Sequence, residues 1–256
     1  ILFLRNIFAF LIFVPIIYFK GFKIFKTDKI WFHAIRSTTG IVAMVIFFHS
    51  LSIMNISLVT ALSFTAPLFS ALLAIYFLDD RPNKHQIFAL FVGFAGVLVV
   101  LQPGAEEFQL EGLLMIICAF FWAVSGIFIK QLSKTDHPLG ITLYMTIFMG
   151  LYTFPFAIYY WETPNFDSMI WVFGIAITSN ILQYSLAKAL SHTDMSVVLP
   201  IDFTRLVFSA GLAFIIFGEV MDWNAVYGSI IILAGAFYTT IVGRRSKIKI
   251  AKETLG

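Results

Sequence analysis

Apolar residues in this chain gather into nine long runs separated by short polar gaps. The runs cover residues 3–19, 34–53, 57–78, 86–101, 112–129, 139–160, 169–190, 197–217 and 225–243. As α-helices, segments of this length cross most or all of a hydrocarbon core roughly 30 Å thick. The alternation of period two that marks membrane β-strands is absent from the runs. We therefore predict an all-α, polytopic membrane helix bundle with nine visible spans.

The composition of the chain excludes a soluble globular domain. Of its 256 residues, 60% are hydrophobic and 12% are charged, and its mean hydropathy is +0.92. Soluble domains carry about 25% charged residues. The single cysteine, Cys118, lies in an apolar run, so disulfides and cysteine metal sites are excluded. We expect no metal and no cofactor.

The basic residues divide the gaps into two alternating sets. One set, with the C-terminal tail, holds Lys20, Lys23, Lys26, Lys29, Arg36, Arg81, Lys84, Lys130, Lys134, Lys188, Arg244, Arg245, Lys247, Lys249 and Lys252. The other set holds Glu106, Glu107, Glu111, Glu162, Asp167, Glu219 and Asp222. Lys and Arg are retained on the cytoplasmic side of membranes, so we predict a cytoplasmic C-terminus. Arg5 and Arg205 lie outside this pattern.

An internal repeat relates the two halves of the chain. Residues 51–96 align without a gap with residues 190–235 and share 13 identities in 46 positions. The alignment places Phe64-Thr65 over Phe203-Thr204, residues 69–74 over 208–213, Ala95-Gly96 over Ala234-Gly235, and Asp80 over Glu219. The matched runs are five spans apart, an odd number, so they cross the membrane in opposite directions. Inverted repeats of this kind are typical of secondary transporters.

The repeat also predicts the domain organisation. We assign residues 1–104 to a first repeat, 105–245 to a second repeat, and 246–256 to a basic cytoplasmic tail. The run at 112–129 has no partner 139 positions earlier in the chain. We therefore expect an arrangement of ten spans, five in each repeat, with the first helix of the first repeat missing from this sequence.

Several stretches resemble the EamA-type transporters of the drug/metabolite transporter superfamily. They are Thr60-Ala-Leu-Ser-Phe-Thr-Ala-Pro67, Leu78-Asp-Asp-Arg81, Val198-Leu-Pro-Ile-Asp-Phe-Thr-Arg-Leu206 and Phe217-Gly-Glu219. The resemblance covers the whole chain. Within the superfamily, the chain is similar to alphaproteobacterial members labelled metabolite or S-adenosylmethionine permeases. It implies two inverted EamA repeats, a central cavity and transport of small organic solutes across the bacterial inner membrane. The superfamily handles many solute classes, so the resemblance leaves the substrate open.

Asp202 and Arg205 are the most conspicuous candidates for a solute site. They share one face of the run at 197–217, where ionisable groups are costly inside a membrane. Arg205 could anchor a carboxylate or phosphate of the solute, with Asp202 as its partner or as a proton carrier. The alternative is a structural ion pair. Pro200 lacks a backbone donor and could leave a carbonyl free toward the cavity.

Other polar and aromatic residues within the runs are weaker candidates. Those that could bind the solute are Trp122, Ser125, Tyr144, Asn180, Gln183, Tyr184 and Thr65, and His49 is a candidate for proton coupling. For His49 the alternative is a satisfied buried imidazole, and for Thr65 it is a hydrogen bond to its own backbone. For the others, helix packing or an interhelical hydrogen bond is the alternative.

These observations favour a secondary transporter that works by alternating access. No nucleotide-binding loop or catalytic cluster is present in the sequence, so we do not expect an enzyme. A membrane scaffold or subunit, and less readily an intramembrane enzyme, remain the alternatives. The expected partners are a small-molecule substrate and the lipid bilayer, with no nucleic acid and with a homodimer left open. Arg205 favours an anionic solute, whereas the acidic extracytoplasmic gaps could attract cations.

Overall fold

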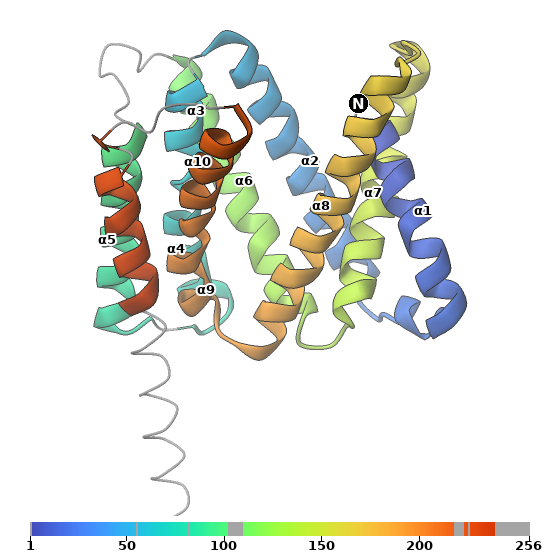
Figure 1. Ribbon diagram of the computed structural model, residues 1–256. Helices are drawn as coiled ribbons and strands as arrows, with labels where there is room; N and C mark the ends of the chain where they lie inside the picture. Colours follow the sequence, from blue (N-terminus) through green and yellow to red (C-terminus); the bar gives the residue numbers. More distant parts are fainter. Residues whose placement is uncertain are drawn as a thin grey trace, which may run out of the picture. The chain divides into compact units, whose positions relative to one another are not determined.

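The computed structural model describes residues 2–54, 56–80, 82–101, 110–217, 223–224 and 226–238, and all regular structure within them is helical (Figure 1). The elements are α1 (Leu2–Lys20), η1 (Phe22–Phe25), α2 (Ile30–Ile53), α3 (Ile56–Ser63), α4 (Ala66–Phe77), α5 (Lys84–Leu101), α6 (Leu110–Leu132), α7 (Pro138–Tyr159), α8 (Phe166–His192), α9 (Met195–Asp202), α10 (Thr204–Phe217) and a helix at Val226–Tyr238. Within these described residues, six segments are long and apolar enough to span a membrane. The predicted polytopic helix bundle is confirmed. The basic tail at 246–256 lies outside the described residues.

The chain divides into two compact units, each drawing on both halves of the sequence. Unit 1 comprises residues 1–42 and 124–192, and unit 2 comprises residues 43–123 and 193–256. The helices α2 and α6 contribute residues to both units. The repeat boundary near residue 104 remains a prediction.

Unit 1 is built around the packing of α1, α7 and α8 against one another. Its apolar core contains Phe13, Ile24, Leu139 and Leu143. The α6–α7 connection is short, and α7 begins with Pro138, whose missing N–H costs nothing in a first helical turn. The ring of His137 accepts a hydrogen bond from the Leu139 N–H and thereby caps this helix.

Unit 2 contains two spans that are each interrupted by a turn of one or two residues. Residues 57–78 are divided between α3 and α4, and residues 197–217 between α9 and α10. Pro67 stands in the first turn of α4 and has no N–H for the preceding turn, which explains the first break. The side chains of Ser63 and Thr204 each donate to a backbone carbonyl three residues earlier, at the two breaks.

The breaks occupy equivalent positions in the two repeats. The first follows Ser63 and the second follows Asp202, and these residues are aligned by the sequence repeat. At both interruptions the backbone stays in the right-handed helical region, with φ -74° and ψ -17° at Thr65 and φ -61° and ψ -24° at Phe203, so each is a local irregularity rather than an unwound segment. In unit 2, α9 packs against both α4 and α5.

Candidate functional site

The break between α9 and α10 carries the predicted charged pair. Arg205 is the second residue of α10 and its side chain is 51% exposed, while that of Asp202 is 39% exposed. The Nε atom of Arg205 lies 3.7 Å from Oδ2 of Asp202, beyond hydrogen-bonding distance. Among the described residues, no hydrogen bond reaches the two Nη groups of Arg205. This guanidinium is therefore able to bind a carboxylate or phosphate by donating two parallel hydrogen bonds to it.

Two repeat-related phenylalanines form the platform beneath Arg205. Its guanidinium carbon lies 4.6 Å above the ring centre of Phe64, a cation–π arrangement. The ring centres of Phe64 and Phe203 are 5.8 Å apart, and both side chains are buried. The Phe203 ring also occupies the space where a side chain at Gly93 would project. The platform is therefore fixed by packing on α5, while the charge above it stays accessible.

A second group of polar residues lies in unit 1, around the first two turns of α2. Arg36 is 1% exposed, and its Nη1 donates to the Ile141 carbonyl at 2.8 Å. Its Nη2 donates to Gln183 Oε1 at 2.9 Å and lies 3.2 Å from the sulfur of Met145. One guanidinium thus connects α2 with α7 and α8. Within the described residues no carboxylate lies within ion-pair distance of it.

His33, one turn before Arg36 on α2, forms a buried pair with Asp136 of the α6–α7 connection. His33 Nε2 lies 2.8 Å from Asp136 Oδ2, and the Tyr144 ring centre lies 4.5 Å from the imidazole. Burial raises the pKa of the Asp136 carboxyl, but hydrogen bonds from Thr27, His33 and Thr135 outweigh burial, and the net pKa is lowered. This pair fastens the α6–α7 connection to the start of α2.

The structure places the other predicted residues in different surroundings. Ser125 donates to the Arg36 carbonyl, Tyr144 donates to the Phe25 carbonyl, and Gln183 accepts from Arg36, so these three lie around the same part of α2. Asn180 is buried and donates to the Ala9 carbonyl. The ring of Tyr184 faces the ammonium group of Lys188.

The remaining candidates belong to unit 2. Trp122 packs against Phe47 with ring centres 5.2 Å apart. The Thr65 hydroxyl donates a hydrogen bond to the Leu62 carbonyl, three residues earlier in the chain. The side chain of His49 is exposed on α2. No group of three or more His, Cys, Asp and Glu side chains in the described part of the chain could hold a metal ion.

Sequence reasoning missed the residues that organise unit 1. It counted Arg36 among the cytoplasmic charges, which is wrong for its environment, because α2 begins at Ile30 and places Arg36 two turns inside a helix. It also passed over His33 and Asp136. The i, i+3 spacing of His33 and Arg36 on one helix face was the available signal. Their partners, Asp136 and Gln183, are more than 100 positions away and have no sequence signature.

Comparison with known proteins identifies a transporter family that matches most of the chain. The EamA-like transporter family matches residues 1–102 and 109–241. An S-adenosylmethionine uptake transporter of Rickettsia bellii is 28% identical over 92% of this chain and 81% of its own length. A riboflavin transporter of Vibrio cholerae is 30% identical over 73% of this chain and 63% of its own length. A protein of known crystal structure shares the fold, with a TM-score of 0.81 and 16% sequence identity over 95% of this chain and 87% of the other.

Proposed function

Because the chain belongs to the EamA-like transporter family and is a membrane transporter of small metabolites rather than an enzyme, we propose that it is a secondary transporter of the bacterial inner membrane. In this proposal it works by alternating access through a central cavity, with its C-terminus in the cytoplasm. The inverted sequence repeat, with short helix interruptions at equivalent positions, is the observation that supports the mechanism. Two similar halves of opposite orientation are able to exchange conformations and so to open one site toward either face.

Arg205 is the proposed anchor for the solute. It is a half-exposed cation beside a helix break, and its Nη groups find no hydrogen-bond acceptor among the described residues. We assign Asp202 to the same site, as the partner of Arg205 or as a proton carrier. Within the same unit, Trp122 and Thr65 are the other proposed solute contacts, and His49 stays a candidate for coupling. The candidates of unit 1, namely Ser125, Asn180, Gln183, Tyr184 and Tyr144, are proposed solute contacts of that unit.

The proposed solute carries an anionic group together with a planar ring. The anionic group follows from Arg205, and the ring from the aromatic side chains proposed as contacts. Relatives named for S-adenosylmethionine and riboflavin support a solute of this size. S-adenosylmethionine has a carboxylate that Arg205 could bind, and a sulfonium that Asp202 could balance.

The test is to measure metabolite pools by mass spectrometry in cells that express the protein, its Arg205→Ala variant, or neither. We expect one solute to accumulate or to be depleted only with the native protein, and an effect at least about tenfold weaker with the variant. Lys26→Gln serves as the matched control, because it removes an exposed cation in the connection between η1 and α2, which holds none of the proposed solute contacts.

Each outcome of this experiment has a defined meaning. Pools that are unchanged by the native protein at confirmed membrane abundance would refute transport and favour the scaffold alternative. A native effect that Arg205→Ala retains would keep transport and reduce Arg205 to a structural role.

A further inference from the structure

Asp80, just beyond the end of α4, caps the N-terminus of α9 from the other half of the chain. Its Oδ2 accepts the Ser196 backbone N–H at 2.9 Å, and its Oδ1 accepts the Ser196 hydroxyl at 2.9 Å. First-turn N–H groups have no partner inside their own helix, and a carboxylate there is favoured by the helix dipole. The residue expected to cap α9, Asp194, makes no side-chain cap hydrogen bond. The cap of α9 is therefore supplied from 116 positions away.

The turn that carries Asp80 is conformationally restricted. Asp79 has φ 53°, and no other non-glycine residue in the described ranges has a positive φ. Asp79 directly follows Leu78, the C-cap of α4, and helices commonly end with a residue in this left-handed conformation. The Asp80 N–H returns to the Ala74 carbonyl at 3.3 Å. The turn thus directs the Asp80 carboxylate toward α9.

The sequence repeat contains the parts of this cap twice. Ser57 aligns with Ser196, Gly218 with Asp79, and Glu219 with Asp80. Glycine is the residue that favours a positive φ, so its occurrence opposite Asp79 matches the conformation observed there. Serine, a turn residue and an acid recur together in both repeats. A cap that held only one helix end together would not require this correspondence.

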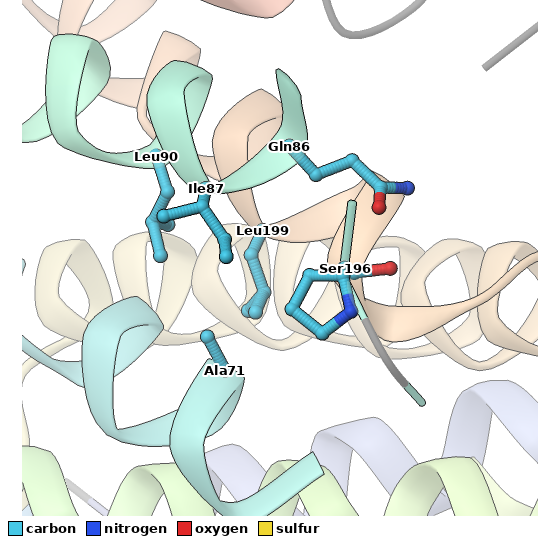
Figure 2. A pocket seen from close by; sticks show the side chains of 7 residues that line it. Ala71, Gln86, Ile87, Leu90, Ser196 and Leu199 are labelled. Carbon is cyan, nitrogen blue, oxygen red and sulfur yellow. The ribbon is translucent and has the colours of Figure 1, made fainter. Parts of the chain in front are cut away.

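Beneath the cap, α9 packs against α4 and α5. Figure 2 shows a small apolar hollow at this contact. It is lined by residues of α4, α5, α9 and the α4–α5 connection, namely Ala71, Pro82, Gln86, Ile87, Leu90, Ser196 and Leu199. The first turn of α9 thus rests on apolar side chains of its neighbours, and the Asp80 cap holds its N-terminus.

We propose that the Asp80–Ser196 cap is a latch that holds the transporter closed at the membrane face where α4 ends and α9 begins. This proposal rests on the proposed alternating access. In the closed state the cap joins the two repeats through α4 and α9. To open that face, the first turn of α9 moves away from α5, and both hydrogen bonds to Asp80 break. Asp80 is a positioning residue in this scheme and does not contact the solute.

The test measures access to the hollow below the latch. Leu199→Cys introduces a thiol at a buried position of the lining, and Cys118, buried in the core of unit 2, is a natural reference. The protein in lipid nanodiscs, where both faces meet the solvent, is treated with a maleimide, and the labelling of each thiol is followed by mass spectrometry. When Asp80→Asn is added, we expect the thiol introduced at position 199 to label on the order of three to ten times faster, because charge-assisted hydrogen bonds are lost.

Several variants separate a latch from a general loss of stability. Ser196→Ala removes one of the two bonds, so we expect a smaller increase, and Asp80→Glu is expected to restore slow labelling. Adding Ser196→Ala to Asp80→Asn should change the labelling rate of the introduced thiol little, because the two residues act as one pair. Asp28→Asn, which removes an exposed acid elsewhere, should leave labelling at the native rate.

Two results would overturn the latch. One is unchanged labelling of the introduced thiol in both Asp80→Asn and Ser196→Ala. The other is a parallel rise at Cys118, which would indicate that unit 2 had unfolded. Neither depends on a transported solute, so failure of the latch and failure of the transport function are observed separately. Unchanged metabolite pools with a clear shift in labelling would reject transport and keep the cap as a conformational contact.

Discussion

Arg36 and Arg205 both lie inside apolar helices, but their surroundings differ. Arg36 is 1% exposed and its Nη groups contact three protein atoms on two neighbouring helices. The Arg205 side chain is 51% exposed, and its partner Asp202 is 3.7 Å away. A buried cation whose two Nη groups are hydrogen-bonded to neighbouring helices holds them together, although the buried Nε of Arg36 has no hydrogen-bond partner among the described residues. Burial therefore favours a structural role for Arg36 and the proposed solute-binding role for Arg205.

Gln183→Ala tests the connection made by Arg36. The change removes the Oε1 acceptor and leaves the Nη2 group of Arg36 with only the Met145 sulfur, a weak acceptor, which costs about 1–3 kcal/mol. We expect a lower thermal unfolding midpoint, measured in detergent, than for the native protein. Ser179→Ala on the same helix is the control, because this exposed hydroxyl bonds only to its own helix. Equal midpoints for the two variants would contradict the assignment.

Asp136 predicts a dependence of stability on pH. Its pKa is lowered in the folded protein from the ordinary value of 3.8, so the folded state prefers the ionised carboxylate. The resulting stabilisation of the folded state is complete above pH 3.8 and is lost as the pH falls through the lower pKa that Asp136 has in the folded protein. We expect native protein to unfold at higher temperature than Asp136→Asn near pH 6, with the gap closing toward pH 3. Asp28→Asn should track the native protein across the range.

At the scale of helices, the repeat is visible as a close crossing of α5 with the helix at Val226–Tyr238. A Cβ added at Gly96 would lie 3.0 Å from the Gly228 carbonyl oxygen and 3.1 Å from the Ile232 nitrogen. A Cβ added at Gly235 would lie 3.3 Å from the Ala89 carbonyl oxygen. Since the repeat aligns Gly96 with Gly235 and Ala89 with Gly228, the crossing is made of two equivalent contacts. Small residues let membrane helices approach this closely.

Gly96→Ala measures the importance of that crossing. The added methyl group meets backbone atoms that have no room to yield, so we expect a loss of about 1–3 kcal/mol and a lower unfolding midpoint. Gly174→Ala on α8 is the matched control, because a Cβ there meets nothing within 4 Å. There the higher helix propensity of alanine should leave stability equal or slightly raised. A Gly96→Ala midpoint equal to that of Gly174→Ala would show that the crossing is adjustable.

At the scale of the whole molecule, the orientation of the chain in the membrane can be tested directly. The basic residues are concentrated in alternate gaps and in the C-terminal tail, which predicts a cytoplasmic C-terminus. A C-terminal fusion to a fluorescent protein that matures only in the cytoplasm should therefore fluoresce, and a fusion to a periplasmic phosphatase should be inactive. The reverse pattern would invert the assignment of every gap and also move the Asp80 latch to the outer face.

The sequence by itself determined the class of molecule, the order of its spans and its family. Long apolar runs leave no alternative to membrane helices, because the hydrocarbon core demands that every backbone group be bonded within its own segment. The inverted repeat was equally legible, since identities at a constant offset such as Phe64 and Phe203 need no structure to be seen. Asp202 and Arg205 stood out because charge is rare inside such runs.

Only the tertiary structure decided which polar side chains meet and where the spans break. The bonds from Arg36 to Gln183, from His33 to Asp136 and from Asp80 to Ser196 join residues more than 100 positions apart. Hydropathy reports how apolar a segment is and carries no information about which neighbour its polar groups will find. The helix breaks stayed hidden for a related reason. An interrupted helix keeps the apolar composition of a continuous one, so hydropathy does not reveal the interruption, although Pro67 marks the first of the two in the sequence.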